Sequence, residues 1–135
     1  MALLFSHIST RGLVGTGANQ MIAGFVIEGA SSRRVLIRAS GPALAGFGVG
    51  GTLAEPRMEL YNSRNFLHAS AGAWGLQTNA DEIRGAAKVV SAFELADGSK
   101  DSAMVVTLLP GAWTVQVSGA NNTTGVALVE AYVLP

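Results

Sequence analysis

The clearest alternation of apolar and polar residues lies in the last quarter of the chain. Trp113, Val115 and Val117 are separated by single polar residues, which is the period of two expected of a strand with one buried face. Residues 126–134 are apolar on both faces, which predicts a strand that is covered on both sides. The turn-forming stretch GANNTTG at 119–125 lies between them. We therefore predict a hairpin in which Trp113, Val115 and Val117 are buried.

Further apolar segments are short and are separated by glycine, proline, asparagine and serine. They predict strands at residues 3–9, 21–28, 34–40, 58–61, 66–70 and 102–109, with a glycine-rich connection at 12–19. A helix is predicted at residues 78–87, because Asp81 and Glu82 suit its first turn, and a single helical turn at 42–45. This order predicts an all-β fold, an antiparallel β-sandwich or jelly roll of about eight strands with one short helix.

Composition narrows the class of protein. A length of 135 residues fits one domain, so we assign residues 1–135 to a single β-sandwich. Charged residues make up 13%, against about 25% in average soluble domains. No apolar run approaches the roughly 18 residues of a membrane span, so we expect no membrane insertion. A surface this poor in charge predicts contacts with other protein chains.

The charges are unevenly placed along the chain although their sum is zero. Residues 1–68 hold six arginines and three acids, which gives +3, and residues 69–135 hold three bases and six acids, which gives −3. No basic groove for nucleic acid is expected from this distribution. The asymmetry favours head-to-tail association of copies.

Residues that carry catalytic or metal-binding chemistry are sparse. Cysteine is absent, which excludes disulfides, thiolate metal sites and a cysteine nucleophile. His7 and His68 lack metal-ligand spacing, and no serine lies in a nucleophile elbow. The stretch GLVGTG at 12–17 is followed by a strand-like segment and not by the helix of a phosphate loop, and the acids of 97–101 are weak evidence for calcium. We expect neither enzyme activity nor a cofactor or metal.

Two interior charges need partners. Arg38 and Glu130 each interrupt an otherwise apolar strand, and a buried charge is costly unless it is paired. Glu59 is the competing acid. We favour an ion pair between Arg38 and Glu130 or Glu59 that fixes strand register, and the alternative is a polar ligand pocket.

Several blocks of sequence resemble a β-sandwich module that recurs in large secreted and surface proteins of environmental bacteria. They are ISTRG at 8–12, VGTG at 14–17, RVLIRASGPAL at 34–44, LPGAWTVQVSG at 109–119 and VALVEAY at 126–132. The resemblance covers residues 8–132 and implies an accessory unit located outside the cell or on its surface. Related modules often carry Asn and Asp before the tryptophan for which this chain has Ala71-Gly72-Ala73 and Trp74, so it implies no metal there.

Two functions follow as hypotheses. The first is a non-catalytic module that associates with copies of itself in a filament or an array. Strand 3–9 has no charge and no proline to protect it from pairing with a neighbour, so we expect contacts through Leu3, Leu4, Phe5 and Ile8. The alternative is a carbohydrate-binding accessory module in which Trp74, within a glycine-rich loop, is the exposed aromatic platform.

Overall fold

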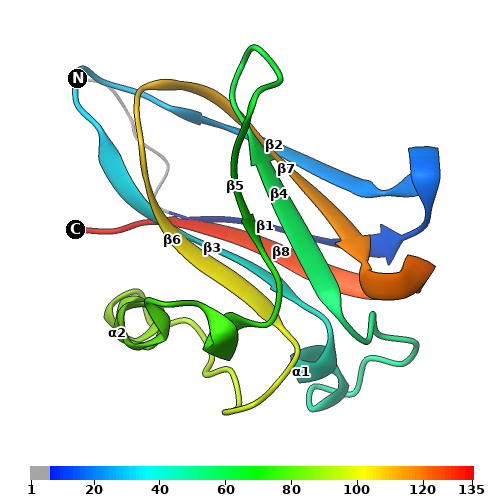
Figure 1. Cartoon of the computed structure of the whole chain (residues 1–135). Helices are drawn as coiled ribbons and strands as arrows, with labels where there is room; N and C mark the ends of the chain where they lie inside the picture. Colours follow the sequence, from blue (N-terminus) through cyan, green and yellow to red (C-terminus); the bar gives the residue numbers. More distant parts are fainter. Residues whose placement is uncertain (1–6) are drawn as a thin grey trace.

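The protein is a sandwich of two antiparallel sheets, seen in a computed structural model that describes residues 7–135 (Figure 1). Each sheet has four strands, and together they confirm the predicted fold class. Sheet A has the order β1 (His7–Val14), β8 (Gly125–Val133), β3 (Arg33–Ser40) and β6 (Ser102–Leu108). Sheet B has the order β2 (Met21–Ile27), β7 (Gly111–Gly119), β4 (Pro56–Tyr61) and β5 (Leu67–Ala71).

Helical structure is short, and the longest helix, α2, packs on sheet A. It consists of α1 (Pro42–Ala45), α2 (Ala80–Val89) and the 3₁₀ turns η1 (Gly17–Asn19), η2 (Trp74–Leu76) and η3 (Ala120–Asn122). The helix predicted at 78–87 is therefore present, displaced by two residues. Glu82 in its first turn accepts hydrogen bonds from Asn79 and Arg34, which lower the pKa of this carboxyl. No helix of the described residues is long and apolar enough to cross a membrane.

The main core lies between the two sheets and is built from alternate residues of each strand. Trp113, Val115 and Val117 of β7 are 7%, 1% and 0% exposed, which confirms their predicted burial. The facing side chains of sheet A include Ile37 and Val129. The period-two pattern of β7 was readable because its other face is turned to solvent.

A second apolar cluster covers the outer face of sheet A. Leu36 of β3 and Tyr132 of β8 pack there with Ile83 of α2, with Trp74 and with Leu95. Strands β3 and β8 are thus buried on both sides, as predicted for residues 126–134. A strand covered in this way carries apolar residues at nearly every position.

The predicted hairpin between residues 113–118 and 126–134 is wrong, because β7 and β8 belong to different sheets. The connecting turn crosses the sandwich and bonds to the segment that precedes β4. Ala120 donates its N–H to Glu55 O over 2.9 Å, and Leu53 donates to Val126 O over 2.9 Å. A Cβ atom at Gly125 would lie 2.6 Å from the nitrogen of Leu53, so the crossing requires glycine there.

The first strand also differs from its predicted bounds. β1 runs from His7 to Val14, through part of the predicted glycine-rich connection, while residues 3–6 lie outside the described residues. Gly12 stays in register opposite Ala127. The absent side chain leaves space that Met21 occupies, since a Cβ at Gly12 would lie 3.0 Å from the Met21 Cε atom.

We predict that Val115→Asp abolishes folding, because it buries an unpaired carboxylate between the sheets. The cost is several kcal/mol, set against a total stability of about 5–15 kcal/mol for a domain. Thr114→Asp is the matched control, because Thr114 is the adjacent residue on the outer face of β7 and is half-buried. Thermal unfolding followed by circular dichroism should show a melting transition for the control alone. Cooperative melting of Val115→Asp near the wild-type temperature would contradict this core.

Candidate functional site

The structure brings Arg38 and Glu130 together on the outer face of sheet A. They are direct neighbours in the register of β3 and β8, and both side chains are buried. Arg38 Nη2 and Nε donate to Oε1 of Glu130 over 2.9 Å and 3.1 Å. Arg38 Nη1 donates to the carbonyl of Phe93 over 2.6 Å, and the Phe93 ring centre lies 4.2 Å from the guanidinium carbon. The cation is thus surrounded by protein partners.

The acid of this pair has a second partner. The hydroxyl of Tyr132 donates to Oε2 of Glu130, and burial together with that carboxylate raises the pKa of Tyr132. Glu59, the competing acid, lies half-buried on β4 in sheet B and is not part of the cluster. Each guanidinium nitrogen of Arg38 donates to a protein acceptor, so the geometry fits an inter-strand pair and not a ligand pocket.

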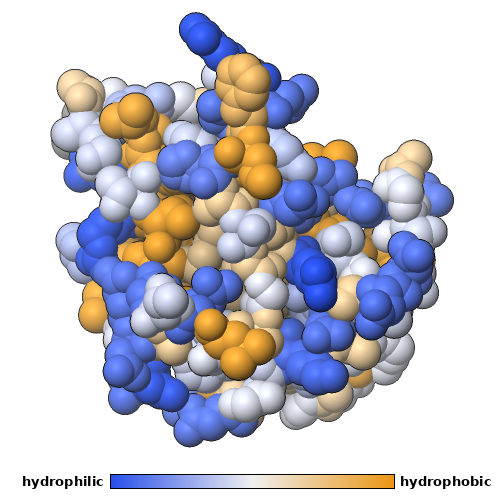
Figure 2. All heavy atoms as spheres, in the orientation of Figure 1, coloured by the Kyte–Doolittle hydropathy of each residue, from blue (hydrophilic) through white to orange (hydrophobic). Residues whose placement is uncertain are grey.

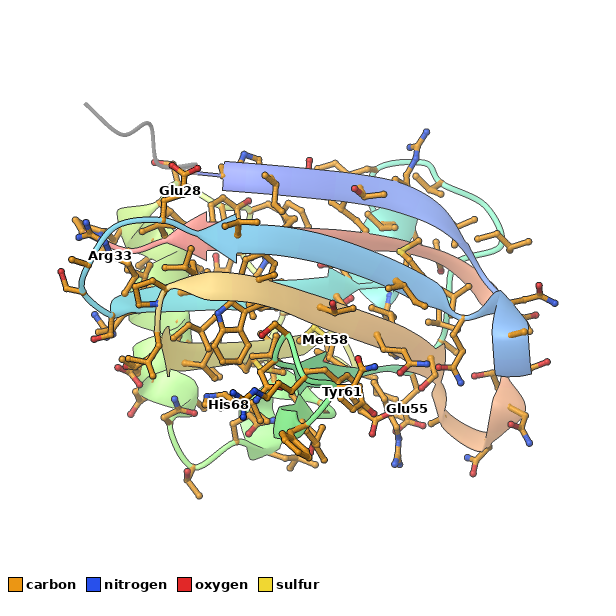
Figure 3. All side chains as sticks on the ribbon, turned by 90° about the horizontal axis from the view of Figure 1, so that it is seen from above. Glu28, Arg33, Glu55, Met58, Tyr61 and His68 are labelled. Atoms are coloured by element: carbon orange, nitrogen blue, oxygen red, sulfur yellow. The ribbon has the colours of Figure 1, made fainter. Side chains whose placement is uncertain are left out.

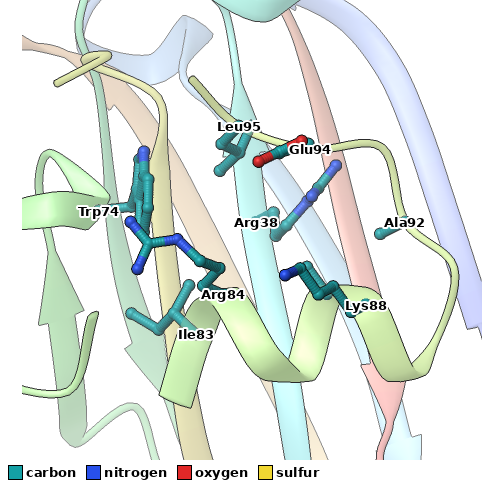
Figure 4. A pocket seen from close by; sticks show the side chains of 9 residues that line it. Arg38, Trp74, Ile83, Arg84, Lys88, Ala92, Glu94 and Leu95 are labelled. Atoms are coloured by element: carbon teal, nitrogen blue, oxygen red, sulfur yellow. The ribbon is translucent and has the colours of Figure 1, made fainter. Parts of the chain in front are cut away.

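A small cavity lies beside this pair, between α2 and sheet A. Its volume of about 60 Å³ gives room for water but not for a metabolite. Figure 4 shows Trp74 and Arg84 side by side in its lining, and the Arg84 guanidinium lies 5.1 Å from the centre of the indole ring. Arg84 also pairs with Asp81 and Asp97 over 3.0 Å and 2.8 Å. Arg38 and Arg84 of this lining therefore both have acidic partners within the protein.

The expectation that Trp74 is an exposed platform is wrong. Its side chain is 2% exposed, and its indole N–H donates to the carbonyl of Ala96 over 3.2 Å. The turn η2 places the indole in the apolar cluster with Leu36 and Ile83. The surrounding glycines suggested an open loop, but the ring packs between α2 and sheet A.

The predicted assembly contact is only partly within the described residues. Leu3, Leu4 and Phe5 lie outside them. Ile8 is half-buried and packs against the sandwich core, because even-numbered residues of β1 face inward. Its part in a contact between copies stays a prediction.

Sequence reasoning missed a less protected edge, which is β2. The four sheet edges are β1, β6, β2 and β5. β1 carries Arg11, β5 has five residues, and the β4–β5 pairing is irregular at Leu60 and Tyr61. At the start of β6, Ser102 pairs with Ala73. β2 has the sequence MIAGFVI, with neither charge nor proline. This composition is visible in the sequence, but the edge position of the strand is not.

The outer face of sheet B carries no helical layer in the described part of the chain (Figure 1). It holds a groove of about 460 Å³ whose polar lining is Arg57, Glu59, Ser70, Gln77 and Ser118. The register explains this convergence, because Ser118 of β7 lies opposite Arg57 and Ser70 of β5 lies opposite Glu59. The sequence analysis did not identify this groove, since its residues come from four separate segments.

Tyr61 follows Glu59 by two residues on β4 and so lies on the same face of sheet B. Figure 3 shows Tyr61 and His68 on the β4–β5 flank of the sandwich, away from β1. Burial, a hydrogen bond to Glu59 and the charge of that carboxylate raise the pKa of Tyr61. An aromatic ring therefore adjoins the polar groove.

We predict that Arg38→Met is better tolerated than Glu130→Ala. The first variant leaves a carboxyl that can take up a proton, whereas the second leaves a buried guanidinium that cannot lose one. Glu130→Ala should cost roughly 3–5 kcal/mol, and Glu59→Ala, the matched control outside the pair, should change stability little. Denaturant unfolding measures all three. Equal free energies of unfolding for Glu130→Ala and Glu59→Ala would show that the ion pair of Arg38 and Glu130 does not stabilise the fold.

Comparison with known proteins supports the fold. No protein-family model matches the chain, and the search of curated proteins finds no match. Among solved structures, the chain is similar to the pre-peptidase C-terminal domain of collagenase from Bacillus anthracis, with 13% sequence identity and a TM-score of 0.54. The match covers 93% of this chain and 89% of the other. At this identity the likeness concerns the fold alone, and the chain is a β-sandwich structurally similar to that collagenase domain.

Proposed function

We propose that the chain is a non-catalytic module that associates with copies of itself, as the subunit of a filament or one unit of an array. The observation that carries this proposal is the position of β2 at an edge of sheet B. A sheet edge presents backbone N–H and C=O groups, and proteins usually protect it with charge, proline, irregularity or a covering element. β2 has neither charge nor proline along seven residues.

Exposed apolar side chains accompany this edge. Ile22 and Val26, on the outer face of β2, are 64% and 52% exposed. The face seen in Figure 2 has apolar atoms in separate patches, including one at the tip of the β4–β5 hairpin. The charged fraction of 13% leaves few groups to repel a neighbour.

The proposed occupant of this edge is the N-terminal segment of a second copy. Residues 1–6 include Leu3, Leu4 and Phe5 and contain neither charge nor proline, so the segment can add as an extended strand through backbone hydrogen bonds. β1 begins and β2 ends at the same end of the sandwich (Figure 1). Because donor and acceptor are different surfaces, the contact is head-to-tail and extends into a filament unless its rotation closes.

The absence of catalysis is supported by the structural engagement of the candidate groups. His7 stacks on Tyr132 with ring centres 4.3 Å apart, and His68 meets Trp113 edge-on at 4.9 Å. Asp101 is buried and accepts hydrogen bonds from the backbone N–H groups of Gly41 and Ala43. The likeness to a domain of a bacterial collagenase supports a location outside the cell or on its surface.

We predict that the full chain forms particles larger than a monomer, and that Ile22→Lys with Val26→Lys reduces their size. Charges on an edge strand oppose its pairing with another strand. The control is Leu13→Lys, which makes the same change at a side chain of β1 that is 72% exposed. Size-exclusion chromatography with light scattering at increasing protein concentration provides the measurement.

Deletion of residues 1–6 tests the donor, because it leaves β1 intact from His7 onward. The truncated chain should remain monomeric at concentrations where the full chain assembles. A full chain that is monomeric at high concentration would refute self-association. Unchanged assembly after the deletion would refute the assignment of the donor segment.

A further inference from the structure

We propose that the polar groove on the outer face of sheet B binds a neutral saccharide. The groove is lined by Arg57, Glu59, Ser70, Gln77 and Ser118. It is independent of the self-association proposal, because strand β7 separates β4 from the edge strand β2. Its volume of about 460 Å³ lies in the range of small-molecule sites.

The groove is held on a rigid frame. Arg57 and Glu59 are consecutive outward residues of β4, which is an interior strand paired with β5 and β7. Outward side chains two residues apart on one strand are separated by about 7 Å. Opposite Glu59 lie Ser70 on one side and Gln116 on the other. Strand pairing thus places the polar side chains of the groove at fixed spacing.

The charged groups of the groove have no ion-pair partner among the described residues. Arg57 and Glu59 lie on the same face of one strand, and neither takes part in a salt bridge within residues 7–135. Arg38, by contrast, has its donors filled by Glu130 and Phe93. The guanidinium of Arg57 offers a fork of donors and the carboxylate of Glu59 a pair of acceptors. Arg57 remains open to a ligand, and Glu59, which accepts a hydrogen bond from Tyr61, keeps further lone pairs for one.

The charge balance of the groove selects a neutral ligand. A phosphate or uronate would be attracted by Arg57 but repelled by Glu59. A cation would be attracted by Glu59 but repelled by Arg57. Vicinal hydroxyls of a sugar donate to carboxylates and accept from guanidinium and amide groups, so they match Glu59, Arg57 and Gln77 together.

Tyr61 adds an apolar contact next to these hydrogen-bonding groups. It is half-buried and follows Glu59 by two residues on β4. An aromatic ring with a polar tip suits a ligand that has one apolar face and a rim of hydroxyls. Pockets that bind small molecules commonly combine such an aromatic surface with a few converging polar groups. The combination favours a saccharide ring over a linear peptide.

The test is isothermal titration calorimetry of the full chain with cellohexaose, xylohexaose and maltohexaose, and with a hexagalacturonate as the acidic probe. At least one neutral hexasaccharide should bind with saturation. Glu59→Gln and Arg57→Gln should each weaken binding about tenfold, because each removes a charge-assisted hydrogen bond. Glu28→Gln is the matched control, since Glu28 is exposed in the turn after β2 and lies outside the groove. It should leave affinity unchanged.

Thermal unfolding of each variant separates loss of binding from loss of fold, and Tyr61→Ala provides a further variant that leaves both groove charges in place. It should also weaken binding. Failure of all three neutral probes to bind would overturn the proposal. Preference for the hexagalacturonate would overturn the neutral chemistry, and full affinity in folded Glu59→Gln and Arg57→Gln would place any binding elsewhere.

Discussion

The structure depends on the burial of the two central strands of sheet A, β3 and β8, on both faces. Their inner face packs in the sandwich core and their outer face packs against the cluster that includes α2, so most residues of β3 and β8 are buried. This arrangement encloses Arg38, and removing one partner of a buried pair typically costs about 3–5 kcal/mol. Glu130 and the carbonyl of Phe93 satisfy the cation. The pair therefore links the register of two strands to the loop that follows α2.

Sheet B is built in the opposite way, with one face in the core and one face in solvent. β7 shows this in its alternation of buried Val115 and Val117 with half-buried Gln116 and Ser118. An antiparallel sheet tolerates such an arrangement because its outer face can be polar. The proposed functions both use sheet B, one through its edge at β2 and the other through its polar face at β4. Under these proposals, sheet A supplies the structural frame and sheet B both binding surfaces.

Local patterns in the sequence predicted the strands well, because alternation and two-sided apolarity report directly on burial. They failed at the connection from β7 to β8, where a hairpin and a crossing between sheets use the same turn residues. The crossing is set by contacts of Ala120 and Val126 with residues 51–55, which are distant in sequence. Trp74 was misassigned for a related reason, since its burial depends on the packing of α2.

The candidate sites were harder to predict than the fold. The sequence offered two acids, Glu130 and Glu59, as partners for Arg38, because charged residues stand out within apolar strands. Only the strand register shows that Glu130 is the partner. The groove unites Arg57, Ser70, Gln77 and Ser118 from separate segments, and none of these is unusual in its local context. The edge position of β2 likewise follows from strand order, which the sequence alone did not provide.

The central claim, that copies associate through the edge of β2, is tested most directly by hydrogen exchange of the backbone amides at low and high protein concentration. Edge amides exchange readily unless they gain a hydrogen-bond partner. The account predicts that protection of Met21–Ile27 rises as particles grow, while the interior strand β7 changes little. Growth of particles with unchanged exchange in β2 would contradict it.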